Sequence, residues 1–141
     1  MMRKVITICL LCMIAIMTSA QEKKPFHCEM YNEEYKVYFV LNLYEKNVIV
    51  PGQEVFGELD GFLGSKQCTQ VWAIASSKIN SDNNAEIVLI NNYGSEDLVA
   101  TLTYNKDNTY TYEFKEGSTL KFPVNRKWQK IPKKLVFNKK E

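Results

Sequence analysis

Histidine is almost missing from this chain: His27 is the only one in 141 residues. A Ser-His-Asp or Cys-His catalytic arrangement would have to use it as the base, and no Gly-x-Ser-x-Gly turn is present to hold a nucleophilic serine. A structural zinc site needs about four ligands, mostly histidine and cysteine. We therefore expect no histidine-based catalysis, no bound metal and no cofactor.

Long apolar runs are missing after residue 20, where no segment approaches the roughly 20 residues that a membrane-spanning helix needs. The only long run is residues 5–17, which follows the basic Arg3-Lys4 and precedes the small residues Thr18-Ser19-Ala20. This order is typical of a secretory signal peptide cleaved between Ala20 and Gln21. We expect residues 1–20 to be a signal peptide, residues 21–141 to be a single β-rich domain, and the product to be periplasmic or secreted.

Cysteine is scarce, and two of the four cysteines, Cys9 and Cys12, lie in the expected signal peptide. Leu11 precedes Cys12 in place of the small residue that lipoprotein processing requires, so we expect no lipid anchor. Cys28 and Cys68 remain. An even pair in an exported chain predicts one disulfide, which would stabilise the fold by roughly 4 kcal/mol.

Net charge after residue 20 is zero, but the charges are unevenly distributed. Residues 21–114 hold seven lysines against fourteen acidic residues, whereas residues 115–141 hold nine basic residues against two acidic ones. One interpretation is that the basic segment lies across the acidic body and neutralises it; the other is a basic face for an anionic glycan or lipid headgroup. Nucleic acid is not expected as a partner, because an exported neutral protein seldom meets it.

Helical periodicity is also nearly absent after residue 20, while apolar and polar residues often alternate with a period of two. Turn signals such as Pro51-Gly52 and Glu116-Gly117 separate the alternating runs. The pattern predicts strands over 26–31, 34–44, 47–50, 54–60, 68–75, 85–91, 98–105, 109–115, 118–122 and 134–138. Regular short strands of this kind predict an all-β fold: an antiparallel meander forming a small coiled barrel or a β-sandwich. Gly57 and Gly61, on one side of a predicted strand, indicate a sharp bend; the alternative is a ligand that approaches the bare backbone there.

Two neighbouring acidic residues are the sequence feature that would fit a hydrolase. Glu58 and Asp60 lie two apart on a predicted strand, about 7 Å between Cα atoms by strand rise. A glycosidase needs two carboxyl groups roughly 5–9.5 Å apart on either side of a sugar. Neighbouring acids on one exposed strand face are common, so this pair is only a weak indication.

Aromatic residues are plentiful: seventeen Phe, Trp and Tyr residues, all after residue 20. Strands favour aromatic residues for packing, which explains most of them. Tyrosine also offers a flat ring with a polar tip, suited to stacking on sugars. Tyr104, Tyr110 and Tyr112, neighbours across a predicted hairpin, are the candidates for an exposed platform.

A basic segment around a tryptophan supplies the remaining candidates. Its possible ligand-binding residues are Arg126, Lys127, Trp128, Lys130, Lys133 and Lys134. The segment would grip an anionic polymer through charge and cation–π contact. Alternatively it is a crossover whose Trp128 plugs one end of the barrel, and we favour this structural interpretation.

The junction Ser19-Ala20-Gln21, followed by a small β-domain rich in Lys, Asn and Tyr, resembles that of small exported β-rich proteins of Bacteroidetes-type bacteria. The resemblance implies a periplasmic or secreted setting in a Gram-negative cell, and it implies no function.

Together these patterns favour an exported, non-enzymatic binding protein whose partner is a glycan, an anionic envelope component or another protein. The alternatives are a small hydrolase acting on envelope or dietary polymers and a protein-interaction module of the inhibitor or immunity type. An interior cavity would instead favour a lipocalin-like carrier.

Overall fold

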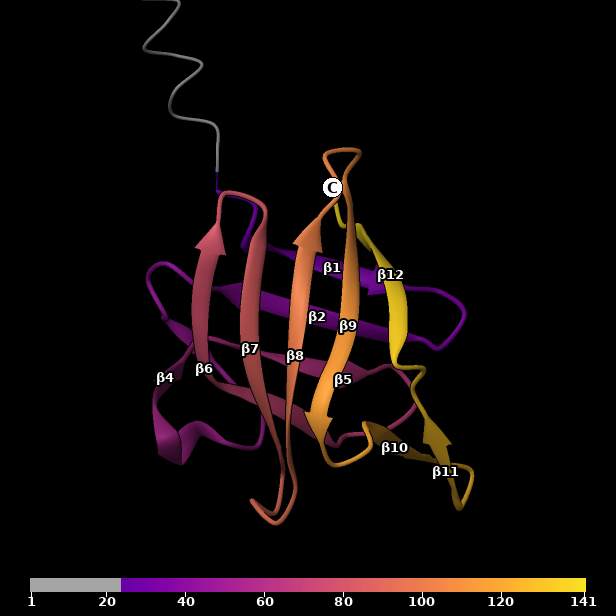
Figure 1. Cartoon of the computed structure of the whole chain (residues 1–141). Coiled ribbons are helices and arrows are strands. Elements are labelled where there is room, and N and C mark those ends of the chain that lie inside the picture. The colour runs from indigo at the N-terminus through magenta and orange to yellow at the C-terminus, as the bar shows by residue number, and fades with distance from the viewer. Residues whose placement is uncertain (1–23) are drawn as a thin grey trace, which may run out of the picture.

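The protein is a closed eight-stranded antiparallel barrel with two small hairpins attached (Figure 1). The computed structural model describes residues 24–141. Barrel order is β1-β12-β9-β8-β7-β6-β5-β2, with β2 paired again to β1. The barrel strands are β1 (His27–Asn32), β2 (Val37–Asn42), β5 (Gly61–Ser65), β6 (Val71–Ser81), β7 (Asn84–Asn91), β8 (Asp97–Tyr104), β9 (Thr109–Gly117) and β12 (Lys134–Lys139). The predicted all-β antiparallel fold is therefore confirmed, and of the two predicted forms, barrel and sandwich, the structure shows the barrel.

Both hairpins interrupt the meander without changing its order. Between β2 and β5 the chain forms a flap of β3 (Val48–Ile49), the short 3₁₀ helix η1 (Glu54–Phe56) and β4 (Glu58–Leu59). Between β9 and β12 it forms the hairpin of β10 (Lys121–Val124) and β11 (Lys127–Lys130). Figure 1 shows β6 to β9 crossing in front of β1, β2 and β5, with the β10–β11 hairpin projecting from one end.

Alternation along the strands explains the barrel. On β8, Leu98, Ala100 and Leu102 are buried, while the residues between them are half-buried or exposed. Successive side chains of a strand point to opposite faces, so each barrel strand gives one apolar row to the interior. The largest fully buried side chains are Tyr110, Tyr112, Phe26, Phe39, Phe122 and Phe137. These rings fill the interior, and the two hollows described below lie at one end of the barrel and on the outer face of β1 and β2.

Glycine allows a close approach of backbone between β5 and β2. Gly61, at φ 153°, lies opposite Leu41, and a Cβ there would be 2.3 Å from the backbone oxygen of Val40. Gly57 lies outside any strand, at the end of η1 with φ 69°. Only Gly61 of the two predicted bend glycines is therefore within a strand, where bare backbone permits close approach.

Several strand limits differ from the prediction. Residues 54–60 form a helical turn and two residues of strand, because the chain reverses at Gly57. Strand β5 follows directly and was not predicted; its run Gly-Phe-Leu-Gly-Ser is buried on both faces and so lacks alternation. The β11 strand was also missed, because its charged residues are mostly exposed.

The predicted signal peptide, residues 1–20, lies outside the described residues. Among residues 24–141, no helix has the length and apolar character needed to cross a membrane.

Candidate functional site

A hollow at one end of the barrel, between the β7–β8 turn and the β10–β11 hairpin, brings two exposed aromatic rings close to several polar side chains. We name it the tryptophan hollow. It encloses about 170 Å³ and is lined by Gln70, Trp72, Asn91, Tyr93, Ser95, Glu96, Lys121 and Trp128. Trp128 is 56% exposed and Tyr93 is 77% exposed. The volume of the hollow is below that of sites that enclose a small ligand, so the aromatic rings and convergent polar groups offer a surface to one face of a ligand.

The hairpin holds Trp128 in position through its other face. Lys121 and Trp128 share one face with their cross-strand partners, whereas Phe122 points the opposite way and is fully buried. The indole N–H of Trp72 donates to the backbone oxygen of Lys121 at 3.0 Å. One side of the hairpin is thus fixed to the barrel, and the side with Trp128 faces solvent.

Lys121 connects the two walls of the hollow. Its Nζ lies 4.9 Å from the centroid of the Trp128 ring and 3.6 Å from Oε1 of Glu96 on the β7–β8 turn. A cation over an indole face is held by the ring quadrupole. Lys121 therefore places one ammonium group between an aromatic face and a carboxylate, where it can bind an oxygen of a ligand.

The opposite wall is the β7–β8 turn, which is held by its own asparagines. Oδ1 of Asn91 accepts from the backbone N–H of Ser95 at 3.0 Å. Oδ1 of Asn92 accepts from the backbone N–H of Val71 at 2.6 Å, which ties the turn to β6. Such turns fix the backbone through local side-chain hydrogen bonds. Tyr93 is therefore presented at the tip of an ordered turn.

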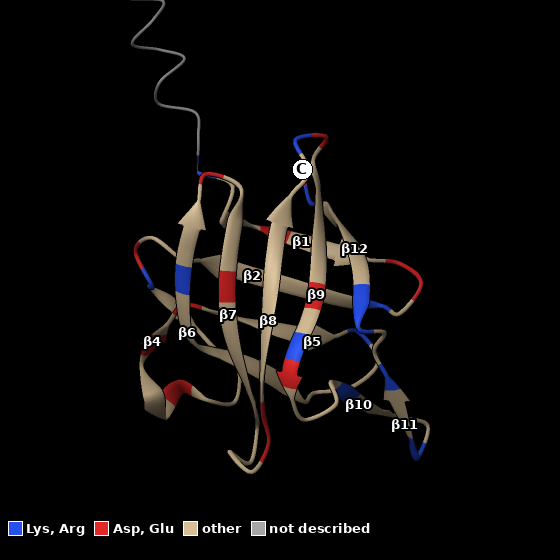
Figure 2. Cartoon of the chain, in the orientation of Figure 1, with Lys and Arg blue, Asp and Glu red and all other residues tan. Residues whose placement is uncertain are grey.

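Positive charge surrounds the hollow on the hairpin side. Figure 2 shows Lys and Arg on the β10–β11 hairpin and at the start of β12. No acidic residue occurs between Glu116 and Glu141. The exposed basic residues of this stretch include Arg126, Lys127, Lys130, Lys133 and Lys134. The predicted basic segment is therefore open to solvent, and Trp128 does not plug the barrel as the favoured structural interpretation required.

The prediction of an exposed platform is wrong for two of its three tyrosines. Tyr110 and Tyr112 are fully buried in the barrel interior. Tyr104 is half-buried and packs on Tyr110, with 5.0 Å between ring centroids. The alternation of β9 was correct, but sequence did not show which of its faces is the inner one; the tyrosines take the inner face because their rings fill the core.

The predicted disulfide is also wrong, since Cys28 and Cys68 are both free. Cys28 lies opposite Leu41 on β2, whereas Cys68 follows Ser65, which lies opposite Val37 on the same strand. These two partners, Leu41 and Val37, are four residues apart on β2, roughly 13 Å by strand rise, so the register places Cys28 and Ser65 at opposite ends of β2. A disulfide requires Cα atoms within about 7 Å, and Cys68, three residues beyond Ser65, forms none.

The acidic pair of the hydrolase alternative does not form a cleft. Asp60 is buried; it accepts a hydrogen bond from the Ser77 hydroxyl and lies 3.6 Å from Lys46. Glu58 is exposed on β4. His27 is exposed at the start of β1. Within residues 24–141, no three His, Cys, Asp or Glu side chains gather as metal ligands would.

Sequence reasoning found Trp128 but missed the partners that surround it. Lys121 and Glu96 are 25 residues apart in the sequence, and the β8–β9 hairpin, which pairs Leu98 with Gly117, brings them together. Tyr93 followed by Gly94 in a polar turn was the available signal, because a large aromatic at a turn tip is exposed.

Comparison with family models, with curated proteins and with solved structures finds no match to this chain.

Proposed function

We propose that this chain is an exported, non-enzymatic glycan-binding protein, and that the tryptophan hollow binds an anionic sugar of an envelope component or other polymer. The observation that carries the proposal is the exposed indole of Trp128 with the ammonium group of Lys121 4.9 Å from its ring centroid. An exposed ring offers its face to the C–H side of a pyranose. The Lys121 ammonium group, which is paired with Glu96 in the free protein, exchanges that carboxylate for a carboxylate or sulfate on the same sugar.

Polar side chains around the ring supply the remaining contacts. Gln70 and Ser95 line the hollow and offer an amide and a hydroxyl group, which can donate and accept hydrogen bonds; the Asn91 amide is already bonded within the β7–β8 turn. Sugar hydroxyls need both kinds of partner. The exposed lysines of the hairpin extend the positive field beyond the hollow, which favours a charged polymer over a neutral one.

The hydrolase alternative is less well supported. Of the residues lining the hollow, Glu96 alone carries a carboxylate, and it pairs with Lys121. Glycoside hydrolysis ordinarily uses two carboxyl groups facing each other across the sugar. We therefore assign binding, and not hydrolysis, to the hollow.

The experiment is titration calorimetry with heparin, hyaluronan and polygalacturonate oligosaccharides, with neutral dextran for comparison. We expect at least one anionic glycan to bind and dextran not to bind. Trp128→Ala should weaken binding about tenfold or more, as for a central aromatic contact. Phe56→Ala is the matched control, because Phe56 is also an exposed aromatic, 66% accessible, on the flap. Equal affinity of wild type and Trp128→Ala, or equal loss in both variants, would refute the proposal.

A protein-interaction module is the second candidate, and the flap favours it. Ile49, Val55 and Phe56 are all exposed there, and exposed apolar clusters mark protein contacts. A photo-cross-linking residue at position 56, in producing cells, should then give one defined covalent adduct. Absence of an adduct would remove this candidate.

A further inference from the structure

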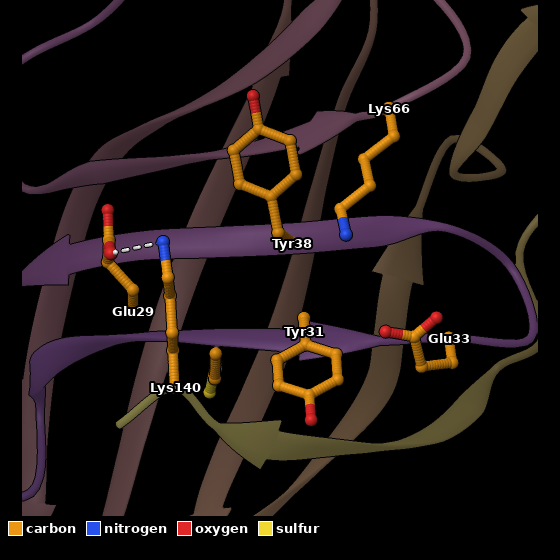
Figure 3. A pocket seen from close by; sticks show the side chains of 7 residues that line it. Glu29, Tyr31, Glu33, Tyr38, Lys66 and Lys140 are labelled. Atoms are coloured by element: carbon orange, nitrogen blue, oxygen red, sulfur yellow. Dashed lines mark ion pairs between the residues drawn. The ribbon is translucent and has the colours of Figure 1, made fainter.

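A second hollow lies on the outer face of β1 and β2, on strands that do not line the tryptophan hollow (Figure 3). We name it the tyrosine groove. It encloses about 330 Å³, near the lower limit for sites that bury a small ligand. Its lining residues are Glu29, Met30, Tyr31, Glu33, Tyr38, Lys66 and Lys140.

Two tyrosines form the groove's apolar surface. Tyr31 and Tyr38 lie directly opposite each other on β1 and β2. Figure 3 shows their rings reaching in opposite directions, Tyr38 toward β5 and Tyr31 toward β12, with broad ring faces toward the viewer. Both side chains are half-buried. Each ring thus keeps part of its surface available to a ligand.

Gly64 creates the place where the Tyr38 ring lies. A Cβ on Gly64 would be 2.7 Å from Cζ of Tyr38, which is closer than real contacts allow. The Tyr38 ring also meets Phe62 edge-on, with 6.0 Å between centroids and 80° between planes. The ring is therefore held over bare backbone by its neighbours and needs no ligand to order it.

The charged side chains form an ion pair at one end of the groove and none at the other end. Glu29 and Lys140 form an ion pair at 3.4 Å. Glu33 and Lys66 lie toward the other end (Figure 3), and neither takes part in an ion pair among residues 24–141. The lining holds two carboxylates and two ammonium groups, so the groove is balanced in charge, unlike the basic surroundings of the tryptophan hollow.

We propose that the tyrosine groove binds a neutral saccharide through two neighbouring hydroxyl groups. One hydroxyl donates to the Glu33 carboxylate, the next accepts from the Lys66 ammonium group, and the C–H face of the ring packs on Tyr38. A carboxylate and an ammonium group that are not paired with each other match the donor and acceptor roles of a diol. A peptide strand is disfavoured, because β1 and β2 are each hydrogen-bonded on both sides in the closed barrel.

The proposal does not depend on the tryptophan hollow, and the two sites fail separately. The test is an amide ¹H–¹⁵N NMR titration with neutral hexasaccharides of gluco, manno, galacto and xylo configuration. We expect at least one to cause saturable shifts at the Gly64 and Lys66 amides, without effect at Ser95 in the other hollow. Added salt should leave this affinity unchanged, because the site is balanced in charge.

Two variants make the test specific. Gly64→Ala keeps every lining side chain but displaces the Tyr38 ring, and Lys66→Gln removes one charged donor; each should weaken binding about tenfold. Lys78→Gln, an exposed lysine on β6, is the matched control and should bind as wild type does. The amide spectra themselves report whether each variant is folded.

Three results would overturn the proposal. The first is that no hexasaccharide shifts these amides at millimolar concentration. The second is that only a charged or zwitterionic probe, such as polygalacturonate fragments or glycylglycine, shifts them. The third is that Gly64→Ala, folded by its spectrum, binds as tightly as the wild type.

Discussion

Two tyrosines of β9 show how burial and hydrogen bonding act separately on one residue type. Tyr110 donates its hydroxyl proton to the backbone oxygen of Pro25, whereas the hydroxyl of Tyr112 is buried with no hydrogen-bond partner. An unpaired buried polar group is costly, while a paired one is mildly stabilising. The two Phe variants should therefore behave differently.

We expect Tyr110→Phe to lower the free energy of unfolding by about 1 kcal/mol. Tyr112→Phe should leave it unchanged or raise it slightly, because it removes a polar atom that makes no bond. Urea unfolding at neutral pH measures both. A larger loss in Tyr112→Phe than in Tyr110→Phe would contradict the assignment of partners.

Alkaline pH should destabilise the fold through the same residues. Burial raises the pKa of Tyr112 well above its ordinary value near 10, and burial also raises the pKa of Tyr110. The unfolded chain ionises from about pH 10 while the folded chain does not, so the stability present below pH 10 is lost as pH rises further. For Tyr112 the slope is at most about 1.4 kcal/mol per pH unit. Tyr112→Phe should show a shallower alkaline decline than the wild type in thermal unfolding.

Free cysteines give a second prediction at this scale. In protein lacking residues 1–20, a thiol reagent should titrate two thiols without prior reduction. Burial raises the pKa of the Cys28 thiol, so its labelling should remain slow at neutral pH and accelerate as pH rises above the ordinary thiol range. Cys28→Ser and Cys68→Ser identify which thiol reacts. Thiols that become titratable only after reduction would restore the disulfide.

The positions of most barrel strands were predictable from the sequence. The segments that meet around the tryptophan hollow were not. Period-two alternation is a local signal, and it located β7, β8 and β9 nearly to the residue. Strand β5 has two buried faces, and β11 is mostly exposed, so neither alternates clearly. The tryptophan hollow joins β6, the β7–β8 turn and the β10–β11 hairpin, and no local pattern encodes that meeting.

Gly61 lies where β5 passes close to the backbone of β2. An alanine Cβ would lie 2.3 Å from the Val40 backbone oxygen, and φ of 153° is unfavourable for alanine. Because backbone cannot move aside as a flexible side chain does, we expect Gly61→Ala to cost about 1–3 kcal/mol or more of unfolding free energy. Gly52→Ala, at positive φ but with no atom within 4 Å, is the control for backbone strain alone. Equal losses in the two variants would show that crowding is not the cause.

At the scale of the whole molecule, the feature of the sequence that bears most on function is its uneven charge distribution. The excess of basic residues after residue 114 collects on the β10–β11 hairpin and the start of β12 (Figure 2). Such a field attracts polyanions and is screened by salt. The sequence therefore located the basic surface, although it did not show whether Trp128 was inside or outside.

Salt should then weaken binding of an anionic glycan to the tryptophan hollow. Lys127→Gln with Lys130→Gln should lower affinity at low ionic strength and reduce its salt dependence, because both ammonium groups are exposed on the hairpin that carries Trp128. Lys78→Gln, on β6, serves as the control. Affinity measured across a series of NaCl concentrations gives the slopes; identical slopes for wild type and the double variant would exclude a role of the hairpin charges.

Glycan binding at the tryptophan hollow is tested most directly by following the indole N–H signals of the tryptophans in a ¹H–¹⁵N spectrum. The chain has two tryptophans: Trp128 is exposed, and Trp72 is buried with its N–H bonded to Lys121. Trp128→Ala assigns the two signals. On titration with heparin, hyaluronan or polygalacturonate oligosaccharides, we expect at least one glycan to move the Trp128 signal saturably and further than that of Trp72. A Trp128 signal that stays in place with all three glycans would contradict the assignment of this hollow as the binding site.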